Sequence, residues 1–538
     1  FLAEISAGKE VFMGIFKEIP GIEKDQNGHS VFYVDGAPFT ALGGEIHNSS
    51  SSSLAYMEER VWPALKPLHM NPVILPIAGE TVEPEEGKFD FTLVDGLLSS
   101  ARNHGMRLIL LWFGLWKNGI STYVPGWVKK ASSGLNARFF RARDSFGKPL
   151  DCISPFCNEA VEADAAAFGR LMQHLLVADE ERTVIAVQVE NEIGVLNSDR
   201  DFCPAAEKAF HEQVPPVVAK KYGDGDWTSV FGRDAAEMMM AWQYAVSVEK
   251  IASCGKKEYP LPMYVNAWLE QHPDRAGSYP CGGPIAKVME LWRLAAPSVE
   301  CYAPDIYVND FRSVCDEYAA AGNPLFIPEV RATKDSASFL MYAVGKHQAL
   351  CFAPFGIEDL FANRKDNIGN DLLATLNIGA DAFNSDGAGE RLAAAYNMIG
   401  NMQEIIAQAH QSGRIHAFLE FNDAGITIPC SKYDVQISYT GSSASFFSRG
   451  SQKHGDAVAA GFVIELSEDE FILCGNGYRA SFLPKPGVPE IVGVLKKEEG
   501  YYQNNAWVPG RTLNGDEGYF IALSDFPQVQ RVSLFSYH

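Results

Sequence analysis

Two glutamates with clear chemical potential each follow a short apolar run. Residues 183–192 read Thr-Val-Ile-Ala-Val-Gln-Val-Glu-Asn-Glu, so a β-branched segment ends abruptly in Glu190, Asn191 and Glu192. Residues 323–330 repeat the pattern and place Glu329 after Leu-Phe-Ile-Pro. Moving a carboxylate out of water costs free energy, and the carboxyl ends of parallel barrel strands are where active sites lie. We therefore expect both glutamates to belong to one active site.

Paired glutamates on two strands of one barrel are what a retaining glycoside hydrolase needs. One carboxylate attacks the anomeric carbon, and the other donates a proton to the leaving oxygen. We assign Glu329 as the nucleophile and Glu192 as the acid/base, since the charge of Glu329 would raise the pKa of Glu192. Asn191 is expected to bond to the sugar 2-hydroxyl, where a contact that tightens in the transition state helps most.

Further substrate-binding candidates lie at other predicted strand ends. Glu45 and Glu80 could hold sugar hydroxyls, and the alternative is that both are surface acids. Three tryptophans could stack on sugar faces or belong to the core, and they are Trp112, Trp116 and Trp268. Tyr307 is expected to hydrogen-bond the nucleophile.

The elements that position these residues alternate between apolar runs and helical patterns. The predicted strands are 39–45, 72–77, 106–113, 183–192, 262–267, 299–305, 324–329 and 349–355. Helix-spaced apolar residues occupy 54–68, 91–104, 157–178, 204–220, 233–253 and 389–409. This order predicts the α/β class and a (β/α)8 TIM barrel with an insertion after Glu192.

After about residue 411 the chain changes to short β-rich runs separated by turn signals. The runs are 415–421, 433–440, 461–466, 470–475, 489–495, 518–523 and 530–536. We predict two domains: 1–411, a catalytic barrel with an N-terminal arm containing a hairpin at 30–36, and 412–538, an all-β sandwich-like domain.

Three segments resemble a known family. Residues 187–194, Val-Gln-Val-Glu-Asn-Glu-Ile-Gly, resemble the acid/base signature of family 35 glycoside hydrolases, the β-galactosidases of clan A. Residues 83–91 are similar to the segment that these enzymes carry after the second strand, and residues 511–517 resemble the C-terminal β domain of a bacterial subgroup. The resemblance implies catalytic glutamates on the fourth and seventh strands, here Glu192 and Glu329.

Composition excludes several other classes. The chain has 538 residues and a net charge of -22, which argues against nucleic acid or anionic membrane as a partner. It contains no apolar run of about 18 residues, so we predict no membrane span. The ten cysteines form no disulfide framework or paired Cys-x-x-Cys pattern. This usage favours a cytoplasmic location, or a periplasmic or secreted one if a signal peptide preceded Phe1.

The sequence thus predicts a retaining exo-acting β-galactosidase that cleaves oligosaccharides or other β-galactosides. The alternatives are another clan A β-glycosidase, such as a β-glucosidase or an arabinosidase, and a non-catalytic carbohydrate-binding barrel. The twelve histidines form no His-x-His or His-Glu-x-x-His pattern, so we predict no metal and no cofactor. The sequence does not indicate an oligomeric state.

Overall fold

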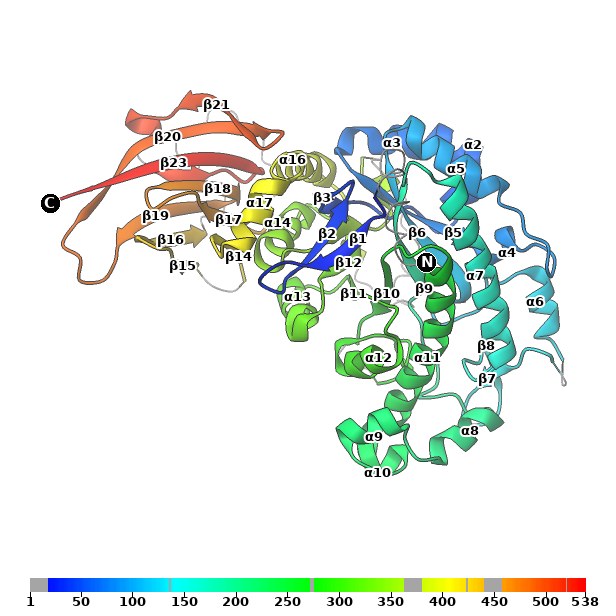
Figure 1. Cartoon of the computed structure of the whole chain (residues 1–538). Helices are drawn as coiled ribbons and strands as arrows, with labels where there is room; N and C mark the ends of the chain where they lie inside the picture. Colours follow the sequence, from blue (N-terminus) through cyan, green and yellow to red (C-terminus); the bar gives the residue numbers. More distant parts are fainter. Residues whose placement is uncertain are drawn as a thin grey trace, which may run out of the picture.

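The computed structural model describes residues 18–134, 137–270, 275–361, 380–421, 424–439, 457–518 and 520–538. Parallel strands surrounded by helices make up the first part of the chain, and antiparallel sheets make up the C-terminal part (Figure 1). This arrangement confirms the predicted fold class, a TIM barrel followed by an all-β domain.

The barrel sheet contains eight parallel strands in the order β4-β13-β12-β11-β10-β9-β6-β5. Their bounds are β4 (Ala41–Leu42), β5 (Pro72–Ala78), β6 (Arg107–Lys117), β9 (Val184–Asn191), β10 (Met263–Trp268), β11 (Cys301–Ile306), β12 (Phe326–Val330) and β13 (Cys351–Pro354). Each of the eight predicted strands is therefore present.

The barrel closes through the backbone that follows β4. Glu45 bridges Ile74 of β5 on one side and Phe355 on the other, and the Ile74 amide donates to the Gly44 carbonyl at 2.9 Å. Gly44 permits a close contact at this seam, because a Cβ atom there would lie 2.4 Å from Cγ1 of Ile357. The closure places Glu45 at the carboxyl end of the first barrel strand.

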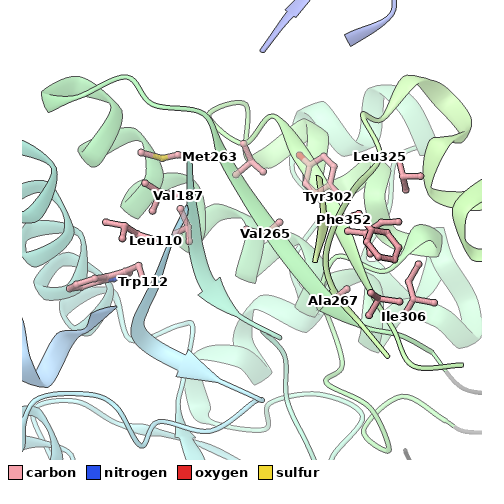
Figure 2. Packing of buried hydrophobic residues seen from close by; sticks show 14 of the residues in the cluster. Leu110, Trp112, Val187, Met263, Val265, Ala267, Tyr302, Ile306, Leu325 and Phe352 are labelled. Carbon is pink, nitrogen blue, oxygen red and sulfur yellow. The ribbon is translucent and has the colours of Figure 1, made fainter. Parts of the chain in front are cut away.

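Alternate residues of each strand face two different apolar layers, as the period of two in a strand requires. Val73, Leu108 and Leu110 belong to the cluster that packs against the helices, part of which Figure 2 shows. Ile74 and Ile109 belong to a second buried cluster, which also includes Phe32 of the N-terminal arm. The barrel interior is therefore a packed core, and the arm contributes to it.

The helices cover the outside of the barrel. Their bounds are α2 (Leu54–Tyr56), α3 (Trp62–Leu65), α4 (Gly79–Val82), α5 (Thr92–Asn103), α6 (Gly126–Ala131), α7 (Asn158–Ala178), α8 (Pro204–His211), α9 (Pro216–Tyr222), α10 (Trp227–Phe231), α11 (Ala235–Glu258), α12 (Met289–Ala295), α13 (Phe311–Ala319), α14 (Ser336–His347), α16 (Ala388–Gly400) and α17 (Gln403–Gln411). The predicted helices at 91–104, 157–178 and 233–253 are confirmed. The predicted 389–409 helix is two helices, and 54–68 includes a π-helical turn at Met57–Val61.

Three short strands precede the barrel, and two more lie in the loop after β6. They are β1 (Gly21–Lys24), β2 (Ser30–Val34), β3 (Ala37–Pro38), β7 (Arg141–Arg143) and β8 (Pro149–Ile153). Strands β2 and β3 form the predicted hairpin, and its turn residues Asp35 and Gly36 both have positive φ.

The C-terminal part consists of two antiparallel sheets, ordered β14-β17-β18-β23-β20-β21 and β15-β16-β19-β22. The bounds are β14 (Ile415–Leu419), β15 (Gly425–Pro429), β16 (Tyr433–Tyr439), β17 (Ala460–Glu465), β18 (Glu470–Asn476), β19 (Tyr478–Pro484), β20 (Ile491–Gln503), β21 (Ala506–Thr512), β22 (Ile521–Leu523) and β23 (Gln528–Tyr537). Val435 of one sheet and Val463 of the other share a buried cluster, as in a β-sandwich. Sequence reasoning missed β15, β19 and β21.

The sandwich packs against α14, the helix that follows β12. The tight fit is visible at Gly345, where a Cβ atom would lie 2.9 Å from both Ala417 and Phe462. The Ser338 hydroxyl donates to the Val458 carbonyl at 2.7 Å. The β domain thus braces the helix that follows Glu329, while the domain boundary at 411 stays a prediction. In the described part of the chain, no helix combines the length and apolar character needed to span a membrane.

Candidate active site

The tip of β9 has an irregular backbone. Glu190 and Glu192 both have positive φ, at 62° and 42°. The pairing of β9 with β6 also shifts between Trp112 and Lys117. In this gap the Glu190 carboxylate accepts hydrogen bonds from the amides of Leu115 and Trp116, at 2.9 and 2.7 Å. Positive φ in residues other than glycine costs free energy and is concentrated at functional sites. The tip of β9 is therefore a candidate functional site.

Three carboxyl groups meet at the carboxyl end of the barrel. One oxygen from each of Glu192, Asp305 and Glu329 lies within 4.8 Å of the other two. Glu192 follows the fourth barrel strand, and Glu329 lies on the seventh. An approach of one oxygen of each to within 4.8 Å agrees better with the 5–5.5 Å, roughly, between the carboxyl groups of retaining glycosidases than with the 6.5–9.5 Å, roughly, of inverting ones. The geometry therefore fits direct attack by one carboxylate.

Glu329 is surrounded by hydrogen-bond donors. The Tyr307 hydroxyl donates to Oε2 at 2.8 Å, and the side-chain amides of Asn191 and Asn266 reach Oε1 at 3.4 Å each. Donors on both oxygens suit an ionised carboxylate and fix its orientation. The contact of Tyr307 with Glu329 is the one that the sequence predicted, and Asn191 also lies beside Glu329, while its bond to a sugar hydroxyl stays a prediction.

The amides themselves are oriented by further contacts. The Lys117 ammonium donates to Oδ1 of Asn191 at 2.8 Å, so the amide nitrogen of Asn191 faces Glu329. Asn266 accepts from the Glu192 backbone amide at 2.9 Å and donates to Asp305 at 2.8 Å. Asn266 thus connects all three carboxyl-bearing residues of the site.

Burial and like charge shape the electrostatics of this cluster. Burial raises the pKa of Glu192 to about 7, and the charge of Glu329 adds to the rise. Burial, followed by Glu329, raises the pKa of Asp305 well above its usual range. Glu45 behaves in the same way: burial and Glu329 raise its pKa, and neither of its carboxyl oxygens has a hydrogen-bond partner among the described residues. A substantial fraction of Glu192 therefore carries a proton up to about neutral pH.

A second buried carboxyl pair lies beside the first. Burial raises the pKa of Asp164 to about 6, and burial together with Asp164 raises the pKa of Glu190 well above its usual range. The Trp112 indole donates to Asp164 at 3.0 Å. This pair connects β6, α7 and the tip of β9.

The structure gives three of the predicted substrate contacts other partners within the protein. Glu80 is exposed and pairs with Lys129 at 3.0 Å, because it lies on α4 beyond the strand end. Trp112 is 1% exposed, and its ring packs against Phe168 of α7, because alternation along β6 directs it to the helix side (Figure 2). Trp116 is equally buried, packs edge-on against Tyr244 and donates to the Ile153 carbonyl. Neither tryptophan lies where it could stack on a sugar.

Trp268 remains a substrate-contact prediction. It ends β10, is partly exposed and pairs in register with Asp305 of β11. Sequence reasoning left Asp305, Asn266 and Lys117 out of the predicted site. Each lies at or near the carboxyl end of a barrel strand, which is the signal that could have identified them.

The cluster of Glu192, Asp305 and Glu329 offers only oxygen atoms, the donors that Mg²⁺ and Ca²⁺ prefer. However, Tyr307 and the amides of Asn191 and Asn266 direct hydrogen atoms at Glu329, where a cation would need its free lone pairs. This donor set suits proton transfer and nucleophilic attack better than cation binding.

Comparison with protein families identifies two regions. Residues 59–228 match the model of glycoside hydrolase family 42, described as beta-galactosidase, and residues 392–524 match a domain of unknown function, DUF5597. The chain carries a glycoside hydrolase domain. The matched family is 42, so the predicted resemblance to family 35 is not supported. Both barrel segments that carried it, 83–91 and 187–194, lie inside the family 42 match.

Solved structures that match the chain include several glycosidases. A β-galactosidase from Marinomonas ef1 is 13% identical over 69% of this chain and 60% of its own, with a TM-score of 0.45. One from Bacillus circulans sp. alkalophilus is 10% identical over 91% of this chain and 98% of its own, with a TM-score of 0.47. An exo-β-1,4-mannosidase from Opitutaceae bacterium strain TAV5 is 15% identical over 70% of this chain and 61% of its own, with a TM-score of 0.40. The chain thus spans less than two thirds of the Marinomonas enzyme. No curated protein sequence matches it.

Proposed function

We propose that this protein is a retaining exo-β-galactosidase that releases terminal β-D-galactose by double displacement. The observation that carries the proposal is the approach of Glu192 and Glu329 to within 4.8 Å at the ends of two barrel strands. The family 42 match over residues 59–228 supports a β-galactoside as substrate.

In the first step Glu329 attacks the anomeric carbon, and the bond to the leaving oxygen breaks. Glu192 donates its proton to that oxygen, which needs a carboxyl group that stays protonated near neutral pH. The raised pKa of Glu192, about 7, meets this requirement. The product of the step is a galactosyl ester of Glu329.

In the second step a water molecule attacks the same carbon and releases Glu329. Glu192, now ionised, takes a proton from the water and returns to its starting state. Each displacement inverts the anomeric centre, so the released sugar keeps the β configuration. Asn191, whose amide reaches Glu329, is proposed to bond to the 2-hydroxyl, and the hydrogen bond from Tyr307 orients Glu329.

Glu45 is assigned to the sugar ring itself. It is fully buried beside Glu329, and both of its oxygens lack a hydrogen-bond partner among the described residues. A buried carboxyl group without partners is costly, and two sugar hydroxyls would satisfy it.

Proton NMR of the first-formed sugar tests the mechanism. With an aryl β-galactoside, β-galactose should accumulate before mutarotation, and α-galactose as the first product would exclude retention. Azide should restore turnover of an activated aryl galactoside by Glu329→Gly and yield α-galactosyl azide, whereas with Glu192→Ala it should yield the β anomer.

A panel of aryl glycosides tests the substrate. The β-galactoside should be cleaved faster than the β-glucoside and the α-L-arabinoside. Preference for one of the latter two would assign the chain to another clan A activity. Binding of galactose without turnover of any substrate would favour a non-catalytic barrel.

A further inference from the structure

Three potential metal ligands converge in the C-terminal domain. His416 lies on β14, Cys430 directly follows β15, and Glu465 ends β17. Strands β14 and β17 belong to the six-stranded sheet, and β15 belongs to the four-stranded sheet. One ligand atom from each of the three residues lies within 4.8 Å of the other two. The cluster therefore joins the two layers of the sandwich.

The carboxylate of this cluster is held in a defined orientation. Oε2 of Glu465 accepts from the Ser431 amide at 2.9 Å and also from the Ser431 hydroxyl. Its other oxygen, Oε1, lies 3.1 Å from Nε2 of His416. Metal-binding carboxylates are commonly fixed by outer hydrogen bonds such as those from Ser431. An ion bound between Oε1 and Nε2 would replace the hydrogen bond between Glu465 and His416.

Burial differs among the three residues in a way that suits an ion. Cys430 is 5% exposed and Glu465 is 6% exposed, so the sulfur and the carboxylate are shielded from water. The His416 side chain is 26% exposed, which leaves a path from solvent. Three protein ligands with access to water match a four-coordinate site whose fourth ligand is a water molecule.

We propose that His416, Cys430 and Glu465 bind a zinc ion that cross-links the two sheets of the C-terminal domain. A thiolate, an imidazole and a carboxylate form a donor set that zinc accepts, whereas Mg²⁺ and Ca²⁺ prefer oxygen alone. On binding, the Cys430 thiol loses its proton to solvent and a Zn–S bond forms, with no change of oxidation state. The ion would tie β14 and β17 to the loop after β15, with water in its fourth coordination position.

The test uses the full-length protein, stripped with a chelator and then titrated with Zn²⁺. Metal retained after gel filtration is measured by plasma mass spectrometry. We expect about one bound zinc per chain, and its loss in Cys430→Ser and in His416→Gln. Cys254→Ser is the matched control, because Cys254 is a partly exposed cysteine on α11 outside this cluster, and it should keep the zinc.

Cobalt substitution reports the ligand directly. Co²⁺ bound by a thiolate absorbs in the near ultraviolet, so this band should be present in wild type and in Cys254→Ser and absent in Cys430→Ser. Zinc should also raise Tm by about 2–5 °C in wild type and leave Cys430→Ser unchanged. Circular dichroism and glycosidase activity show whether each variant is folded.

Three outcomes would overturn the proposal. The first is no stoichiometric zinc on the folded wild-type protein, which would leave a hydrogen-bonded trio of side chains. The second is zinc that survives Cys430→Ser, which would point to the barrel carboxylates. The third is a cobalt complex without the thiolate band. None of these outcomes bears on the glycosidase reaction, which uses different residues.

Discussion

Two buried carboxyl pairs flank the tip of β9, and we propose a catalytic role for only one of them. Glu190 pairs with Asp164, and Glu192 lies with Glu329. Burial raises the pKa of Glu190, Asp164 and Glu192. The difference lies in what surrounds them: backbone amides occupy both oxygens of Glu190, which is 0% exposed, whereas Glu192 is 7% exposed. A raised pKa marks burial, and catalysis also requires access for a reacting atom.

Glu192→Gln and Glu190→Gln should separate the two pairs most clearly. Glu192→Gln removes the transferable proton, so kcat/KM for an unactivated galactoside should fall by about 10²–10⁴-fold. Glu190→Gln keeps the size of the side chain and an acceptor for the amide of Trp116, and should stay within about tenfold of wild type. Steady-state kinetics on lactose measures both, and equal losses would contradict the division.

Glu190→Ala should act on stability. It leaves the amides of Leu115 and Trp116 buried without an acceptor, and each unpaired group costs about 1–3 kcal/mol. Urea denaturation at pH 6 should therefore show a lower free energy of unfolding. A variant with unchanged stability and no activity would make Glu190 catalytic.

Tyr307→Phe and Trp112→Phe each remove one hydrogen-bond donor, from Glu329 in the first carboxyl pair and from Asp164 in the second. Loss of the Tyr307 hydroxyl removes a bond to Glu329, and kcat should fall by about 10–100-fold with little change in Tm. Loss of the Trp112 indole nitrogen removes a bond to Asp164 and should lower the free energy of unfolding by about 1–3 kcal/mol. KM should stay unchanged in Trp112→Phe, and a large rise in KM would restore the sugar-stacking role.

The pH profile sharpens the assignment of Glu192. Since the protonated acid is the active form, kcat/KM should fall above about pH 7, the pKa of Glu192. The positive charge of Lys117 lowers that pKa, so Lys117→Met should raise it and move the alkaline limb to higher pH. Lys129→Met, which affects an exposed lysine paired with Glu80, is the control and should leave the limb in place.

Glu80→Gln should have the smallest effect. The ion pair with Lys129 is exposed on both sides, and such pairs contribute about 0–1 kcal/mol. Both kcat/KM and Tm should match wild type. A tenfold rise in KM would return Glu80 to the substrate-binding site.

The barrel could be predicted because its strands are short apolar runs of β-branched residues with polar ends. The same pattern predicted Glu192 and Glu329, which the structure brings together. The positions of the two tryptophans could not be predicted, because alternation along β6 does not say which of its two faces meets the helices. The ladder between β6 and β9 shifts after Trp112, and no local pattern reveals that shift.

Residues inside apolar runs were also hard to assign. Asn266 and Asp305 lie in strands that otherwise look like core, and only the closed sheet brings them to Glu329. Helices α12 and α13 were missed because they are short, with 7 and 9 residues. Helix α14 has 12 residues, but ten of them are buried, so it lacks the polar face that marks an amphipathic helix. The convergence of His416, Cys430 and Glu465 depends on the pairing of two sheets, which the sequence alone does not give.

Where the first and last barrel strands meet, Gly44 cannot be replaced by a residue with a side chain. Residue 44 has room for nothing larger, since a methyl group there would press on Ile357. Glu45 follows Gly44 in the sequence, and Glu358 follows Ile357. Both belong to the group of carboxylates around Glu329, since the charges of Glu329 and Glu358 raise the pKa of Glu45. Gly44→Ala would thus displace the backbone that carries Glu45 and Glu358. A search for stabilising substitutions should therefore leave this glycine unchanged.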